Sequence, residues 1–153
     1  MTKSLSVSAL FLLTLSSACT NDFYSEADFK SVKKIDTHMH LHAESTALSE
    51  QAKKDNFRLL DVMVDVPDYP PLDDQEKFAL HQVKAYPEVV NYLTAFSLVN
   101  WDSAGWTDKT IARLKTSFNN GALGIKIWKN IGMVYKDSSD NFIMIDNPRF
   151  DPI

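Results

Sequence analysis

Short apolar runs alternate with longer amphipathic stretches after about residue 33, and this alternation constrains the fold more than any other feature of the chain. Runs typical of buried strands lie at residues 34–41, 57–66, 92–99 and 123–128. Amphipathic stretches typical of helices follow the first three runs, at residues 45–56, 73–86 and 107–118. This order predicts βα units that build a parallel sheet.

About four βα units correspond to half of an eightfold barrel. The predicted fold class is therefore α/β, namely the N-terminal half of a (β/α)8 TIM barrel over residues 33–153, truncated at its C-terminus. The sequence stops at Ile153, where we expect a helix to begin. A half-barrel leaves two parallel strand edges open, so we expect self-association through them. A compact four-unit flavodoxin-like domain is the alternative.

The first 18 residues differ in composition from the rest of the chain. They contain one lysine, Lys3, and no acidic residue, and residues 5–18 form an apolar run. This run of about 14 residues is shorter than the ~20 residues that a membrane-spanning helix needs. Residues 1–18 are therefore predicted to be a signal peptide, and the protein to be exported.

Cys19 is the only cysteine of the chain and lies where the apolar run ends. Small residues precede it and polar residues follow it, which resembles a bacterial lipobox, although Ser16 stands where the lipobox prefers leucine. The resemblance implies that Cys19 accepts a diacylglycerol group and anchors the protein to a bacterial membrane, on the periplasmic or cell-surface side. Residues 19–32 would then form a polar tether. A free thiol is the alternative for Cys19.

Asp36, His38 and His40 are spaced two residues apart in the first predicted strand. Because side chains alternate along a strand, we expect all three on one face, with Met39 and Leu41 packing on the other. Two imidazoles at this spacing can converge on one divalent ion such as zinc, iron or manganese. The sequence therefore predicts a metal-ligand pair, His38 and His40; two hydrogen-bonded histidines without a metal are the alternative.

Three segments resemble one enzyme family. Residues 35–40, Ile-Asp-Thr-His-Met-His, resemble the opening motif of the metal-dependent amidohydrolase superfamily. Residues 121–129 and 146–152 are similar to the fourth strand and following helix of its amidohydrolase-related group, which also contains metal-dependent decarboxylases. The resemblance implies a hydrolase that attacks a small-molecule substrate with metal-activated water.

The same resemblance implies roles for individual residues. His38, His40 and a carboxylated Lys126 would bind a divalent metal, with zinc the metal expected first. Asp36 would not bind the metal itself but would hold these ligands in position. The family's later histidine ligands and its general-base aspartate have no counterpart in this sequence. We therefore expect the chain as given not to turn over substrate by itself.

Further polar and aromatic residues follow the predicted strands. His42, Trp101 and Trp106 are predicted to line a substrate pocket, with solvation or packing as the alternatives. A formal net charge of −4 and an isoelectric point near 5.5 disfavour a nucleic-acid partner. This counts against a second enzyme class with the same opening motif, the TatD-like nucleases. The motifs are also compatible with a metal-dependent decarboxylase, a non-catalytic lipoprotein or an inactive truncated product.

Overall fold

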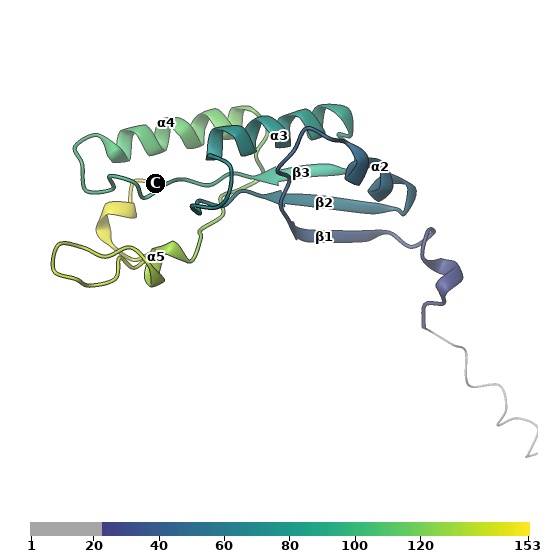
Figure 1. Ribbon diagram of the computed structural model, residues 1–153, viewed down its shortest axis with the longest axis horizontal. Coiled ribbons are helices and arrows are strands. Elements are labelled where there is room, and N and C mark those ends of the chain that lie inside the picture. The colour runs from purple at the N-terminus through teal and green to yellow at the C-terminus, as the bar shows by residue number, and fades with distance from the viewer. Residues whose placement is uncertain (1–22) are drawn as a thin grey trace, which may run out of the picture.

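The computed structural model describes residues 23–153 and contains a three-stranded parallel sheet in the order β1–β2–β3. Its strands are β1 (Lys34–Met39), β2 (Phe57–Val62) and β3 (Val90–Leu93). The longer helices are α2 (Ala47–Lys54), α3 (Leu72–Ala85) and α4 (Trp106–Asn119). Figure 1 shows α3 and α4 along the same side of the sheet. Each strand is thus followed by a helix, as the alternation of the sequence predicts.

Three short elements complete the description: η1 (Glu26–Asp28), α5 (Asn130–Met133) and η2 (Pro148–Phe150). The first lies before the sheet and the other two follow α4 in the chain. Among residues 23–153, no helix has both the length and the apolar character that crossing a bilayer requires. The predicted signal peptide at residues 1–18 and the lipidated Cys19 lie outside the described residues.

The predicted half of a (β/α)8 barrel is wrong. The segment predicted as a fourth strand contributes one isolated bridge, between Thr94 and Ile125, and is no member of the sheet. Its flanking side chains, Leu123 and Ile127, are 64% and 42% exposed, so no packing layer covers them as it covers a buried barrel strand. The chain then turns into α5 rather than extending the ladder. The structure is a partial α/β fold built on three strands.

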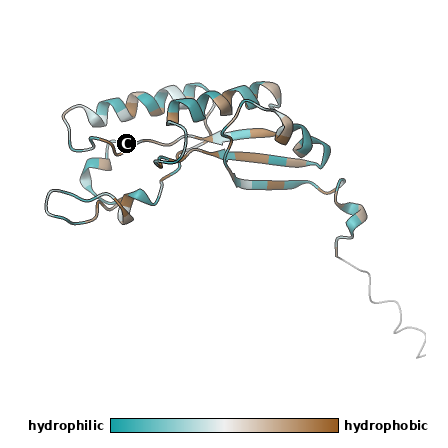
Figure 2. Ribbon diagram, in the orientation of Figure 1, coloured by the Kyte–Doolittle hydropathy of each residue, from teal (hydrophilic) through white to brown (hydrophobic). Residues whose placement is uncertain are grey.

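The apolar core forms where the helices cover the sheet, and Figure 2 shows apolar residues along β2. One cluster joins the β1 end to α2, a second lies under α3, and a third lies under α4. Fully or almost fully buried members include Met63, Val64, Val90, Tyr92 and Leu98. Burial of such side chains is the main force that holds helices of this kind to a sheet.

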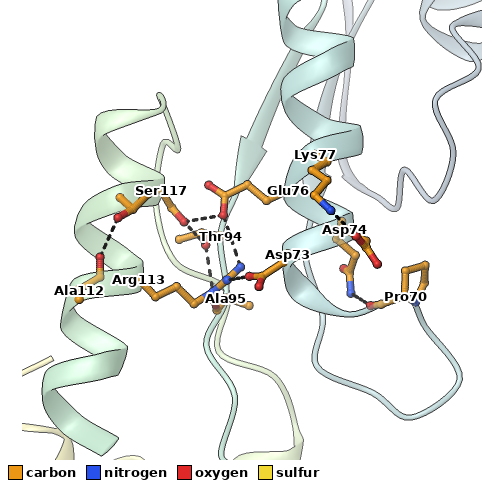
Figure 3. Close-up of polar contacts among 12 residues, drawn as sticks. Pro70, Asp73, Asp74, Glu76, Lys77, Thr94, Ala95, Ala112, Arg113 and Ser117 are labelled. Carbon is orange, nitrogen blue, oxygen red and sulfur yellow. Dashed lines mark hydrogen bonds and ion pairs between the residues drawn. The ribbon is translucent and has the colours of Figure 1, made fainter. Parts of the chain in front are cut away.

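A buried polar network fastens α3 to α4 and to β3 (Figure 3). The carboxylate of Glu76 accepts hydrogen bonds from the Ser117 hydroxyl at 3.0 Å and from the Tyr92 hydroxyl at 3.2 Å. The guanidinium of Arg113 lies 3.4 Å from Glu76 and also pairs with Asp73. Because Glu76 is only 9% exposed, these partners replace the water that its charge would otherwise need.

Candidate functional site

The strand that carries the histidines is irregular. Asp36 pairs with Leu59 and Met39 pairs with Asp61, so three steps along β1 match two steps along β2. Inside this bulge, the Oδ1 atom of Asp36 accepts a hydrogen bond from the backbone N–H of His38 at 3.0 Å. A bulge shifts the side-chain alternation by one residue. The prediction of one common face for Asp36, His38 and His40 therefore does not hold across residues 36–39.

The structure nevertheless brings three imidazoles together at the carboxyl end of β1. The ring centroids of His38 and His40 are 5.2 Å apart, edge to face, and those of His40 and His42 are 5.9 Å apart. The ring of Tyr69 lies 4.3 Å from that of His42 and 5.5 Å from that of His40. We call His38, His40 and His42 the histidine cluster.

The orientation of His40 is set by a backbone hydrogen bond. Its Nδ1 atom lies 2.6 Å from the carbonyl oxygen of Val62, at the end of β2. A carbonyl oxygen can only accept, so Nδ1 is the donor, and a neutral His40 ring then has its lone pair on Nε2. Histidines that bind metals commonly donate their other ring nitrogen in this way. His40 is thus held in the tautomer that a metal ligand needs.

Asp61 is a buried carboxylate beside the cluster that the sequence motifs did not mark. It is 2% exposed, its Oδ1 accepts from the backbone N–H of Leu41 at 2.8 Å, and its Oδ2 has no hydrogen-bond partner. Burial raises the pKa of this carboxyl from its ordinary value of 3.8 to about 6, although the Leu41 N–H and the nearby His40 ring act to lower it. The one signal in the sequence is an isolated acidic residue inside the apolar run 57–64.

His42 is a partly buried member of the histidine cluster. Its Nε2 atom is buried without a hydrogen-bond partner. Burial, helped by the neighbouring His40, lowers the pKa of His42 and so favours its neutral form. The ring of Tyr69 packs against the ring of His42. The sequence analysis did not identify Tyr69, because a loop residue that folds back over the end of a strand has no periodic signal in the sequence.

Lys126 lies beside Trp128 and not beside the histidine cluster. Its amino nitrogen lies 5.9 Å from the ring centroid of Trp128, and it lines a hollow of about 370 Å³ together with Lys129 and Met144. None of the three clustered histidines is among the residues that line this hollow. The structure therefore does not bring Lys126 together with the histidine cluster.

The two tryptophans predicted to line a pocket take part in packing. Trp106 is 5% exposed, its ring packs against Phe96 and Phe150, and its indole N–H donates to the carbonyl of Ser97 at 2.9 Å. Trp101 packs at the edge of the same core cluster. Packing accounts for both positions.

The histidine cluster fits part of a metal-ligand set. His38 and His40 offer two neighbouring imidazoles, one of them held in the required tautomer. Within residues 23–153, no group of three or more His, Cys, Asp or Glu side chains is arranged to hold a metal ion. The described residues thus provide a ligand pair, to which further ligands would have to be added for tight binding.

Comparisons of the chain with models of protein families, with curated proteins and with solved structures gave no match. The resemblance to the amidohydrolase superfamily therefore stays a prediction from the sequence motifs.

Proposed function

We propose that the chain is an exported, lipid-anchored protein of the amidohydrolase-related type, in which His38 and His40 bind a divalent metal for the hydrolysis of a small molecule. One observation carries the proposal: His40 donates Nδ1–H to the Val62 carbonyl while its ring lies 5.2 Å from that of His38. This geometry orients one ligand and places the second beside it. Zinc is the metal that we expect first, because imidazole ligands suit it.

The chain's own residues would prepare the site before substrate arrives. A bound divalent ion would supply a Lewis acid and lower the pKa of a water molecule. Val62 fixes the His40 ring and Asp36 fixes the backbone at His38. His42 packs against the His40 ring, with 5.9 Å between the ring centroids, and so supports it from the loop after β1. Lys126 is left out of the proposed ligand pair because its described contacts are with a different group.

The proposed attachment to the membrane rests on the sequence around Cys19. An apolar run ends at small residues, the cysteine follows, and polar residues come next. Diacylglycerol on the Cys19 thiol would give the protein two acyl chains, which is enough for stable anchoring. Mass spectrometry of the N-terminal peptide from a bacterial membrane fraction tests this attachment directly.

Metal titration tests the ligand pair. The full chain is stripped with a chelator and titrated with Co²⁺, whose visible absorption reports nitrogen ligands, and with Zn²⁺ by calorimetry. We expect His38→Gln and His40→Gln each to weaken binding strongly. The matched control is His81→Gln, which replaces an exposed histidine on α3. Binding that is unchanged in both cluster variants, or lost equally in the control, would contradict the ligand pair.

Activity is tested separately with a panel of esters, lactones and amides, with and without added metal. The assay uses the protein isolated from its native membranes, together with any segment or partner that supplies the family's remaining ligands and general base, because these have no counterpart in this sequence. The proposal expects metal-dependent hydrolysis by this native preparation, which disappears in His40→Gln. Metal binding by the native preparation without any turnover would contradict the hydrolase and leave a metal-binding lipoprotein as the function. Release of carbon dioxide from a carboxylic acid substrate in place of hydrolysis would indicate a decarboxylase.

A further inference from the structure

The segment that follows Cys19 carries an exposed aromatic surface. Phe23, Tyr24 and Phe29 are 87%, 81% and 48% exposed. A hollow of about 680 Å³ lies among residues 24–34. Aromatic side chains at such exposure in one short segment form the kind of patch that marks a contact with a partner or a membrane.

This segment has a defined shape, although residues 19–32 were predicted as a polar tether. Ser25 donates its backbone N–H and its hydroxyl to the Asp28 carboxylate at 2.9 and 2.7 Å, which closes a capping box around η1. The amino group of Lys34 bonds the carbonyl oxygens of Phe29 and Val32, and it lies 4.4 Å from the ring centroid of Phe29. Phe29 is therefore held in an ordered turn, and Tyr24 directly precedes that turn.

The chain between Cys19 and this surface is short. Four residue steps join Cys19 to Phe23, and each step spans at most about 3.6 Å, so the two Cα atoms are at most about 14 Å apart. Acyl chains on Cys19 would lie in the bilayer, whose total thickness is about 40–45 Å. The lipid would therefore hold Phe23 and Tyr24 close to the membrane surface.

We propose that residues 23–34, which we call the foot, bind the lipid bilayer, with the aromatic rings at the boundary between headgroups and acyl chains. Aromatic side chains are favoured at this boundary. Lys30 and Lys33 are exposed in the same segment and can approach lipid phosphates. The foot also contains Glu26 and Asp28, so aromatic insertion, more than charge, carries the binding. The inference rests on the proposed lipid attachment of Cys19.

The position of the foot determines which way the candidate site faces. Figure 1 shows η1 beyond the end of the sheet at which β1 begins. The histidine cluster follows the opposite, carboxyl end of β1. A foot on the bilayer would thus turn the histidine cluster away from the membrane, where a water-soluble substrate has access.

Fluorescence quenching tests the foot on the full chain, purified from bacterial membranes and placed in vesicles of phosphatidylethanolamine and phosphatidylglycerol. Tyr24→Trp adds an indole to the foot, and Val99→Trp adds one at a 58% exposed position in the loop between β3 and α4. Lipids brominated on their acyl chains quench indoles that enter the bilayer, and the parent protein gives the baseline of its native tryptophans. We expect a blue shift and loss of most of the added emission for Tyr24→Trp, and neither for Val99→Trp.

Equal and weak quenching of the two added indoles would contradict the proposal that the foot binds the bilayer. Mass spectrometry of the N-terminal peptide of the same sample separates this outcome from failure of the lipid attachment. Acylated Cys19 without quenching at position 24 would overturn the foot alone. Quenching at position 24 without acylation would keep the foot and overturn the lipid attachment.

Discussion

Replacing Asp61 by asparagine should stabilise the fold at neutral and alkaline pH and not at acid pH. In the folded protein, burial raises the pKa of Asp61 from 3.8 to about 6. The folded state therefore binds a proton on the Asp61 carboxyl more tightly than the unfolded state does. The stability that this proton contributes to the fold is fully present below about pH 3.8 and is lost as the pH rises through about 6. At about 1.4 kcal/mol for each pH unit between the two values, the loss amounts to roughly 3 kcal/mol.

Asp61→Asn removes the charge and keeps an oxygen for the Leu41 N–H. At about pH 4 the protonated parent has an unpartnered O–H at Oδ2, and the variant has an unpartnered amide N–H₂ in its place, so the two proteins should have similar free energies of unfolding. By about pH 8 the parent carries a buried charge that the variant lacks, and the variant should be more stable by roughly 3 kcal/mol.

Urea unfolding of the metal-free full chain, followed by tryptophan fluorescence at a series of pH values, measures this difference. Asp68→Asn, at an exposed loop position, is the control and should show little pH-dependent difference from the parent. A stability difference between Asp61→Asn and the parent that does not change from about pH 4 to about pH 8 would refute the reasoning.

Three further predictions concern buried polar groups. Glu76→Ala removes one buried acceptor from each of Arg113, Tyr92 and Ser117 and should lower the free energy of unfolding by about 3 kcal/mol in urea titrations. A loss below about 0.5 kcal/mol, as for an ordinary surface substitution, would speak against the network. Gln75→Ala removes an amide that bonds both the N–H and the carbonyl of Val64 and should cost about 2–3 kcal/mol in the same assay. Because burial lowers the pKa of His42, the folded state resists its protonation, and the parent should lose stability as the pH falls through the ordinary value of 6.5. In His42→Gln, the free energy of unfolding should fall less than in the parent as the pH is lowered below this value. An equal fall in the variant and the parent would contradict a buried, neutral His42.

The half-barrel was a wrong prediction, but the order of the first three strands and of the helices that follow them was predictable, because burial imposes a periodic pattern on the sequence. The run at residues 57–66 is apolar almost throughout, as a strand covered on both faces requires, and β2 lies within it. The acidic start and apolar stripe of residues 73–86 match α3 to within one residue at each end. The run at residues 123–128 shows the limit of this reasoning. Its backbone bonds to residues 92–94, yet it forms a single bridge and leaves Leu123 and Ile127 exposed, because apolar content alone does not establish that a segment becomes a covered strand.

The candidate site was predictable only in part. The spacing of His38 and His40 indicated that their rings meet, and the structure places them 5.2 Å apart. The bulge could not be foreseen, since it depends on the register between two strands and not on either strand alone. Asp61 and Tyr69 reach the cluster from a different strand and loop, and such long-range contacts have no periodic signal in the sequence.

X-ray absorption at the zinc edge of the zinc-loaded full chain tests the central claim most directly, because it counts the nitrogen ligands and identifies imidazole by its outer-shell scattering. The claim predicts at least two imidazoles with Zn–N distances of about 2.0–2.1 Å in the parent and one fewer in His38→Gln. A spectrum with fewer than two imidazoles, or one that is identical in the parent and in His38→Gln, would contradict it.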